Sequence, residues 1–365
     1  MIKRILLAVF VMALMLRPIN VSAYEDEKTN SMADSVGATE IDSQYLDKDE
    51  LSGDKNINVF QKLLDIITDS LKDNGWSVVK SFGQVFSAVI LCSVMQAMKF
   101  GDNNALSGAT AYISIILLSG VTYSVLYNLF IFAIAALETL STTMAAFMPV
   151  MASLYAMSGE IASAASSASG LAVFLTTLSL ICTKVILPLL QISFALCLSG
   201  AIPNGINLSS VTTLVKNTAT TLMGFAFTLM GFVLYLQTAV AVAGDNFFHR
   251  SVRFASGVFI PVIGNMLGEA SRTVISSVSV IKSTVGAAGT VVILSLVLPP
   301  FLSAVLHRFM LSLAAVLAKS LGCEKEGAFL SELCGVTGVL MALIGGATVV
   351  CLIAMATFIR VGVSA

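Results

Sequence analysis

The sequence predicts an all-α protein that crosses a membrane several times. Hydrophobic residues make up 57% of the 365 positions and charged residues only 11%, whereas a soluble domain averages roughly 45–50% apolar and about 25% charged residues. Such a chain has too few polar side chains to cover a water-soluble globule. Apolar runs near the length of roughly 20 residues that spans a bilayer follow one another along most of it.

Residues 1–23 have the three parts of a secretory signal peptide. Lys3 and Arg4 precede an apolar run over residues 5–16, and small residues end the segment at Ala23. As an uncleaved anchor helix the run would reach only about 18 Å, short of the roughly 30 Å hydrocarbon core. We therefore expect cleavage after Ala23, which leaves the following segment outside the cytoplasm.

Residues 24–75 form an acidic extracytoplasmic tail with 13 acidic and 5 basic side chains. Its first part contains too few large apolar groups to offset the entropy of ordering it. Residues 59–71 instead show helical amphipathic spacing, which fits a helix on the membrane surface or a docking face for a partner. The candidate docking residues are Phe60, Leu63, Leu64, Ile67 and Leu71.

Residues 76–365 form the polytopic membrane domain, which begins at Trp76, an aromatic residue suited to the membrane interface. Its apolar segments cover residues 82–98, 106–129, 140–157, 171–201, 219–243, 258–267, 291–306 and 336–359. The run 258–267 is too short to span unaided and is a candidate re-entrant segment, and 309–321 is an ambiguous amphipathic segment. The sequence thus predicts seven or eight spans.

The distribution of basic residues suggests an orientation, because short cytoplasmic loops are rich in Lys and Arg. With the tail outside, these segments place Lys99 inside together with Arg250 and Arg253. Arg272 and Lys282 would then lie outside, against the rule. We expect a multi-pass protein of the cell membrane with an extracytoplasmic N-terminal tail.

A shift of 112 residues aligns Pro149 with Pro261 and Pro188 with Pro300. Residues 106–201 and 218–313 could therefore be internal repeats, although chance agreement is an alternative. Three crossings in each unit would make the repeat inverted, as in many transporters whose broken helices form the central site. The candidate helix-break or pore positions are Pro149, Lys184, Pro188, Pro261, Pro299 and Pro300.

Lys184 lies within an apolar segment, where a central lysine costs roughly 2.5–3.5 kcal/mol. It could line a pore or pair with a buried carboxylate. Alternatively its ammonium snorkels to the headgroups, or it lies between two short helices. Four carboxylates stand at predicted segment ends, where we expect them to be solvated: Glu138, Glu160, Asp245 and Glu269.

Catalytic, cofactor and metal motifs are not found in the sequence: it has no phosphate-binding loop, HExxH helix or GxSxG elbow, and only two histidines. We predict neither catalytic residues nor a bound cofactor or metal. Nucleic acid is excluded as a partner because no basic stripe is present. Cys323 and Cys334 could form a disulfide if they face an oxidising side. The small residues of 158–170 and 285–289 predict close helix packing.

The stretch 254–289, FASGVFIPVIGNMLGEASRTVISSVSVIKSTVGAAG, resembles the most distinctive block of the stage III sporulation protein AE family of endospore-forming bacteria. The preceding AVAGDNFFHRSVR and the order of segments agree over nearly the whole chain. The resemblance implies a membrane component of the channel complex between mother cell and forespore, located in the mother-cell membrane around the forespore, with a permease-like or export-gate role. It also implies partners: other products of the stage III sporulation A operon, including an ATPase, and a forespore membrane protein.

Two alternatives remain open from the residues alone. The Pro-marked repeat and Lys184 favour a self-sufficient secondary transporter of a small solute. The acidic tail and the amphipathic helix favour a membrane scaffold that recruits partners.

Overall fold

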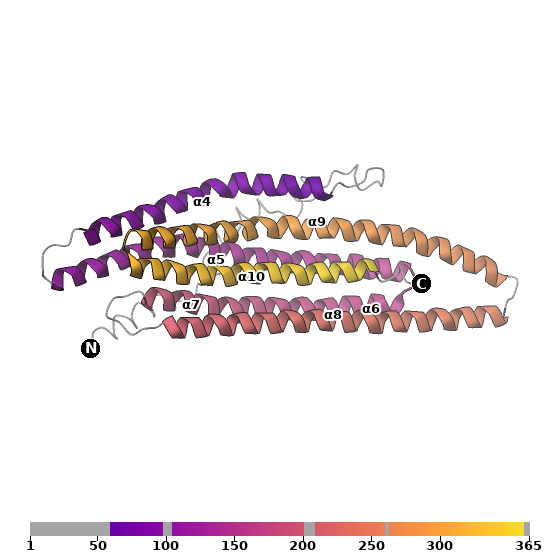
Figure 1. Cartoon of the computed structure of the whole chain (residues 1–365). Coiled ribbons are helices and arrows are strands. Elements are labelled where there is room, and N and C mark those ends of the chain that lie inside the picture. The colour runs from indigo at the N-terminus through magenta and orange to yellow at the C-terminus, as the bar shows by residue number, and fades with distance from the viewer. Residues whose placement is uncertain (1–58, 98–103, 201–208, 260–262, 361–365) are drawn as a thin grey trace, which may run out of the picture.

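The computed structural model describes residues 59–97, 104–200, 209–259 and 263–360, and all regular structure in these ranges is helical. The helices are α4 (Val59–Ala97), α5 (Asn104–Met157), α6 (Ile161–Ser179), α7 (Leu187–Gly200), α8 (Ser209–Phe259), α9 (Ile263–Ser320) and α10 (Glu324–Arg360), and a π-helical segment, η2 (Leu180–Ile186), joins α6 to α7. They lie side by side in one elongated bundle (Figure 1). The predicted all-α class is confirmed, whereas the signal peptide and most of the acidic tail lie outside the described residues.

Six helices of the described part are long and apolar enough to cross a membrane. These segments are Gly75–Ala97, Tyr112–Met157, Ser163–Ser199, Ser209–Phe247, Ser277–Ser320 and Glu324–Ile359. The predicted count of seven or eight is not confirmed. One reason is the predicted interruption between residues 129 and 140, which is wrong: α5 continues through Glu138. A helix satisfies its own backbone hydrogen bonds, so one exposed carboxylate does not end it.

The short run 258–267 is divided between two helices. Its first residues end α8 and its last residues begin α9, while 260–262 lie outside the described part. The described residues of this run therefore belong to α8 and α9, which run in opposite directions (Figure 1), and form no separate helix. The amphipathic segment 309–321 is not a separate helix, because α9 continues without interruption to Ser320.

The continuity of α5 removes one of the passages on which the charge argument for orientation depends. From the end of α4 at Ala97 to Arg250 on α8 the chain passes along α5, then α6–α7, then α8. Three passages bring the end of α8 to the end of the bundle opposite the end of α4 (Figure 1). The sequence argument assumed an even number of passages here, so it gives no support for the orientation of the tail, which stays a prediction.

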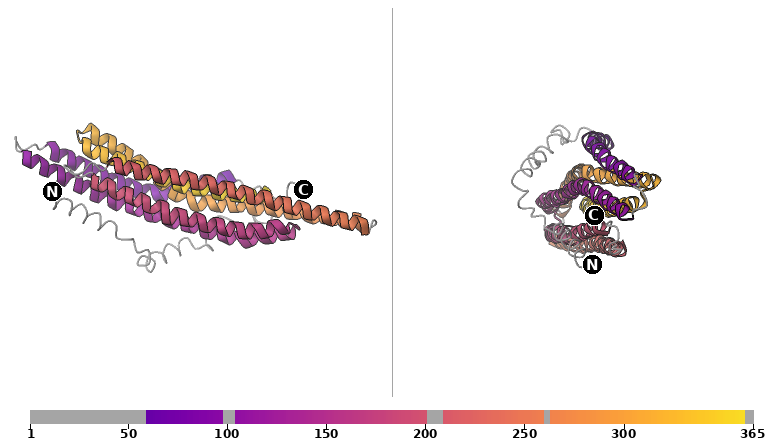
Figure 2. Two further views of the ribbon diagram at one scale, coloured as in Figure 1. Left: turned by 90° about the horizontal axis from the view of Figure 1, so that it is seen from below. Right: turned by 90° about the vertical axis from the view of Figure 1, so that its left-hand side faces the viewer.

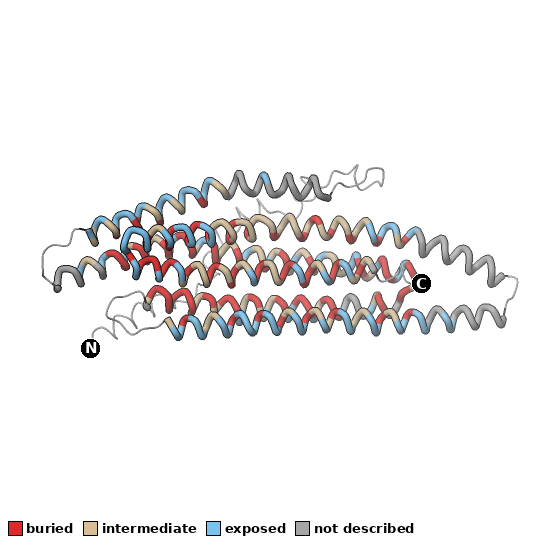
Figure 3. The backbone as a smooth tube through the Cα atoms, viewed as in Figure 1, coloured by how far each residue is buried: buried red, intermediate tan, exposed pale blue. Residues whose placement is uncertain are grey.

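Helix α10 occupies the centre of the bundle and α8 its periphery. In the most apolar stretch of α10, 56% of residues are buried, against 17% for α8. The end-on view in Figure 2 places α10 among the other helices, and Figure 3 shows buried positions along α10 and exposed positions along the outer side of α8. Bulky apolar residues such as Phe225 and Phe232 are exposed on α8, as expected of a lipid-facing helix.

The π-helical segment η2 has a local cause in the sequence. Pro188 has no backbone N–H to donate to the carbonyl of Lys184, and its ring would clash with that carbonyl in a regular α-helix. The wider turns over Leu180–Ile186 directly precede this proline. By contrast, α5 continues through Pro149 and α9 through Pro299 and Pro300.

Close packing of the small-residue segments is confirmed at three glycines. A Cβ added at Gly286 would lie 2.2 Å from Ile359 Cγ1, and one at Gly289 would lie 2.1 Å from Met355 Cε, so α10 side chains pack directly against the α9 glycines. At Gly170 the Cβ would lie 2.3 Å from Gln237 Oε1, which brings α6 close to α8.

The internal repeat is not confirmed. Pro188 follows the π-helical segment, whereas its proposed equivalent, Pro300, lies inside the uninterrupted α9. The other pair cannot be compared because Pro261 lies outside the described residues.

Candidate functional site

The turn between α5 and α6 reverses the chain within three residues. Gly159 has a φ of 79°, its N–H donates to the carbonyl of Ala156 at 3.1 Å, and the N–H of Glu160 donates to that of Tyr155 at 3.0 Å. These bonds define a Schellman motif, which needs a left-handed residue and so favours glycine. The motif places the side chains of Ser158 and Glu160 against the neighbouring helices.

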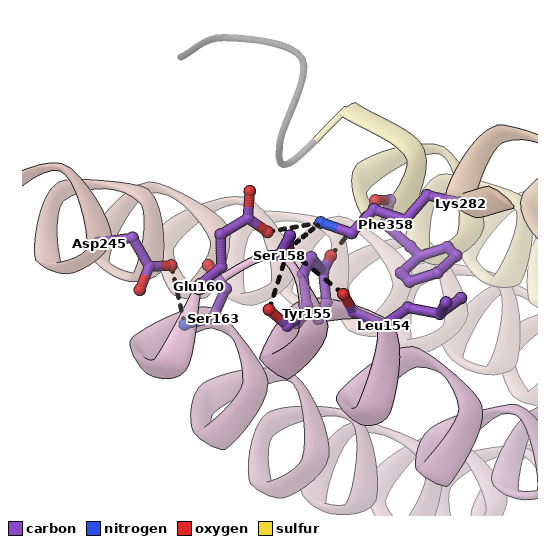
Figure 4. Close-up of polar contacts among 8 residues, drawn as sticks. All are labelled: Leu154, Tyr155, Ser158, Glu160, Ser163, Asp245, Lys282 and Phe358. Atoms are coloured by element: carbon purple, nitrogen blue, oxygen red, sulfur yellow. Dashed lines mark hydrogen bonds and ion pairs between the residues drawn. The ribbon is translucent and has the colours of Figure 1, made fainter. Parts of the chain in front are cut away.

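Glu160 forms a buried ion pair with Lys282 of α9. The Lys282 Nζ lies 2.6 Å from Glu160 Oε2 and 3.0 Å from Ser158 Oγ, and the two charged side chains are only 2% and 9% exposed. The same ammonium lies 4.5 Å from the centroid of the Tyr155 ring. Figure 4 shows these groups converging on Lys282. The ammonium therefore has an anion, a hydroxyl and an aromatic face as partners, which a buried charge requires.

Tyr155 connects this charge cluster to the central helix. Its hydroxyl donates to the carbonyl of Phe358 on α10 at 3.3 Å. The Tyr155 and Phe358 rings pack edge to face, with centroids 5.3 Å apart and an interplanar angle of 81°. The turn is thereby fixed to the end of α10.

Asp245 of α8 caps the start of α6. Glu160, the N-cap residue, makes no side-chain cap hydrogen bond, since its carboxylate faces Lys282. Asp245 Oδ2 instead accepts a hydrogen bond from the N–H of Ser163 at 3.0 Å, as Figure 4 shows. A carboxylate at this position satisfies an unpaired N–H and interacts favourably with the helix dipole.

The cluster holds both arms of the α8–α9 hairpin at its base. Asp245 lies on the outgoing arm and Lys282 on the returning arm. Beyond them α8 continues to Phe259 and α9 begins at Ile263, so the arms extend by about 21 and 28 Å at 1.5 Å per residue. Figure 1 shows them reaching past the ends of α6 and α10.

A small cavity with polar and apolar lining adjoins the cluster. It has a volume of about 60 Å³ and lies between α5, α6, α8 and α10, which is room for a few water molecules. Its polar lining is Tyr155, Ser163, Gln237, Thr238 and Thr357.

The residues proposed from the sequence do not take part in this cluster. Lys184 is exposed on η2, and the buried ion pair is formed by Lys282. Pro149 is exposed, Pro188 and Pro299 are half-buried, and Pro300 is buried. The roles suggested for these positions stay predictions. The proposed docking residues Phe60, Leu63, Leu64, Ile67 and Leu71 lie on the α4 backbone, but their side chains are outside the described part.

The expectation of solvated carboxylates is wrong for Glu160 and Asp245, which are 7% and 5% exposed. Both stand where apolar segments end, but the hairpin and the tight turn cover those ends. No local signal could pair Glu160 with Lys282, because they are far apart in the chain. Glu138 is exposed as expected, although within a helix, and the side chain of Glu269 is not described.

A disulfide between Cys323 and Cys334 is excluded by the helix between them. Both are free thiols, and α10 separates them by about 16 Å along its axis, whereas disulfide-bonded Cα atoms lie within about 7 Å. Within the described ranges, no group of three or more His, Cys, Asp or Glu side chains could hold a metal ion.

Comparison with known proteins identifies the family. The family model of stage III sporulation protein AE matches residues 42–362. Stage III sporulation protein AE of Bacillus subtilis (strain 168) is 26% identical over 255 residues, which cover 67% of this chain and 61% of the relative's length. No solved structure matches. Because the family match extends over most of the sequence, the chain belongs to the stage III sporulation protein AE family.

Proposed function

We propose that this chain is a membrane component of the channel complex that links mother cell and forespore, with a permease-like or export-gate role. Family membership implies a role in sporulation, and the apolar helices fit a multi-pass membrane protein. In this proposal the protein resides in the mother-cell membrane around the forespore, with its N-terminal tail outside the cytoplasm. Its partners are other products of the same operon, an ATPase among them, and through them a forespore membrane protein.

The observation that carries the proposal is the clamped α8–α9 hairpin. The stretch 254–289, which carries the family resemblance, forms the end of this hairpin and its return into the bundle. Asp245 and Lys282 fix the base of both arms to the α5–α6 turn. A helical hairpin that is held at its base and projects beyond its neighbours is accessible to another protein. We therefore assign the docking of complex partners to it.

The transporter alternative, which rests on the Pro-marked repeat and Lys184, stays a prediction. Lys184 is exposed and forms no ion pair with any other described residue. The scaffold alternative depends on residues 24–75, most of which the structure does not describe.

Site-specific photo-cross-linking in sporulating cells tests the proposal. A photoreactive amino acid at Arg250, exposed near the base of the projecting arm, should cross-link to another protein of the operon. The same amino acid at Phe225, exposed on the apolar part of the same helix, is the matched control and should give no protein adduct. If Arg250 gives none either, and the tagged chain purifies without operon partners, the proposal is wrong.

A further inference from the structure

Two cationic side chains rest on glycines of the central helix, far from the charge cluster. Lys216 of α8 and Arg308 of α9 approach α10 from different helices. A Cβ added at Gly335 would lie 3.0 Å from Lys216 Nζ, and one at Gly338 would lie 2.8 Å from Arg308 Nη1. Positions three apart on a helix are neighbours, roughly 5–6 Å apart. Both cationic groups therefore lie over the same patch of α10.

Neither cation has an anionic partner in the described part of the chain. Among the described residues Lys282 and Glu160 form an ion pair, whereas Lys216 and Arg308 form none. Lys216 does interact electrostatically with the Cys197 thiol, which Glu332 also approaches. Glu332, about one turn before Gly335, accepts a hydrogen bond from Ser209 Oγ at 2.6 Å and forms no ion pair with Lys216. Two adjacent unpaired cations repel each other unless an anion lies between them.

The level of the two cations along the bundle corresponds to a membrane boundary. Arg308 lies about 39 Å along α9 from Lys282, and Lys216 about 44 Å along α8 from Asp245, at 1.5 Å per residue. A bilayer with its headgroup regions is about 40–45 Å thick. The charge cluster and the two cations are thus separated by one bilayer thickness.

On α8, α9 and α10 the stretches between these two levels carry no charge. No Asp, Glu, Lys or Arg occurs in residues 217–244, 283–306 or 339–359. On α5 one charged side chain, Glu138, lies between the levels, about 26 Å along the helix from Tyr155. The side chains of the first half of α4 are not described and do not enter this assignment. The uncharged stretches place the two cations at headgroup level.

We propose that Lys216 and Arg308, seated on Gly335 and Gly338, form a binding site for the phosphate of an anionic phospholipid. Arg308 is exposed and Lys216 half-buried, so a headgroup can reach both. Exposed apolar side chains, Leu222 and Phe225 among them, lie on other faces of α8 from this level toward the membrane interior and can contact acyl chains. A lipid fits this arrangement better than a free anion, because the helix that carries Lys216 exposes apolar side chains from this level inward.

Native mass spectrometry of the full chain released from nanodiscs tests the site. Nanodiscs containing phosphatidylglycerol and phosphatidylcholine should yield protein that retains phosphatidylglycerol preferentially. The variant Lys216→Gln with Arg308→Gln should lower this retention on the order of 10- to 30-fold, since each cation near a membrane contributes roughly three- to fivefold. Lys184→Gln, which removes an exposed cation from a nearby level, is the matched control and should leave retention unchanged.

The charge-preserving variant Lys216→Arg with Arg308→Lys should keep most of the retention and separates loss of binding from loss of folding. The proposal is wrong if the charge-preserving variant loses as much phosphatidylglycerol retention as the double glutamine variant. It is also wrong if Lys184→Gln loses as much, or if the double glutamine variant retains as much as the wild type. Competition with inorganic phosphate distinguishes a lipid from a free anion. If phosphate displaces the phospholipid at equal concentration, the ligand is free phosphate and the lipid assignment is wrong.

Discussion

The two tight turns of the bundle have the same backbone and different side-chain chemistry. The α9–α10 turn repeats the Schellman motif of the α5–α6 turn. Gly322 has a φ of 81°, its N–H donates to Lys319, and the N–H of Cys323 donates to Ala318 at 2.9 Å. In the position that Glu160 has in the first turn, the second turn has Cys323, which is fully buried. The same fold of the chain thus has a buried ion pair at one end of the bundle and, at the other, a buried thiol beside a carboxylate, Glu326, that forms no ion pair with a described residue.

The chemistry around Cys323 explains why no clamp is needed there. Burial first, and the nearby Glu326 carboxylate second, raise the pKa of the Cys323 thiol, so it stays neutral at neutral pH and behaves as a small apolar residue. The α9 and α10 arms leave this turn as direct neighbours, packed along a common core. The α5–α6 turn instead has to hold α8 and α9, whose arms continue beyond it. The difference suggests that a buried ion pair is used where a turn must fix two helices that continue beyond it.

The largest effect is expected from breaking the charge clamp. Lys282→Met leaves Glu160 buried without a cation, and removing one partner of a buried pair typically costs about 3–5 kcal/mol. Combining it with Glu160→Gln should recover much of this loss, because no unpaired charge remains. The measurement is the free energy of unfolding in mixed detergent micelles, followed by circular dichroism. Equal instability of the single and double variants would show that the pair is not held together by its charges.

Glycine-to-alanine exchange at the two turns tests whether they are alike in backbone. Gly159→Ala and Gly322→Ala should each cost roughly 1–2 kcal/mol, because a left-handed conformation is unfavourable for a residue with a Cβ. The added Cβ at Gly322 meets no atom within 4 Å, so only the conformation is tested there.

The same pair of variants reports on coupling to the clamp. Gly159→Ala should combine non-additively with Lys282→Met, since both act on Glu160, whereas Gly322→Ala lies at the opposite end and should add independently. Additivity at both turns would contradict the assignment of the clamp to the first one.

How far the sequence predicts these turns depends on the range of the interactions. Apolar runs and helical class follow from composition, which acts residue by residue. The site does not follow from composition. Lys184 has apolar neighbours, which made it a candidate, whereas Lys282 lies among polar residues that are typical of a solvated segment end. Its burial arises only when the α5–α6 turn meets α9, a contact across much of the chain. Breaks placed at Glu138 failed for a related reason, since one polar side chain changes local composition without changing backbone hydrogen bonding.

The same substitution, Glu→Gln, can be made at both turns, and its effect should be smallest at Glu326. Glu326, in the first turn of α10, is 1% exposed. Its Oε1 accepts a hydrogen bond from Gln96 Nε2 at 2.8 Å, and its Oε2 has no hydrogen-bond partner among the described residues. Glu326→Gln removes a poorly compensated charge and keeps an oxygen for Gln96.

We therefore expect Glu326→Gln to change the unfolding free energy by no more than about 1 kcal/mol, with stabilisation the favoured direction, because an unsatisfied buried charge is costly. Glu160→Gln, the matched change at the other turn, leaves the Lys282 ammonium without its anion and should destabilise clearly. The same denaturation assay compares the two. Equal destabilisation would mean that Glu326 has a cationic partner too, and the contrast between a turn with a buried ion pair and one without would then be lost.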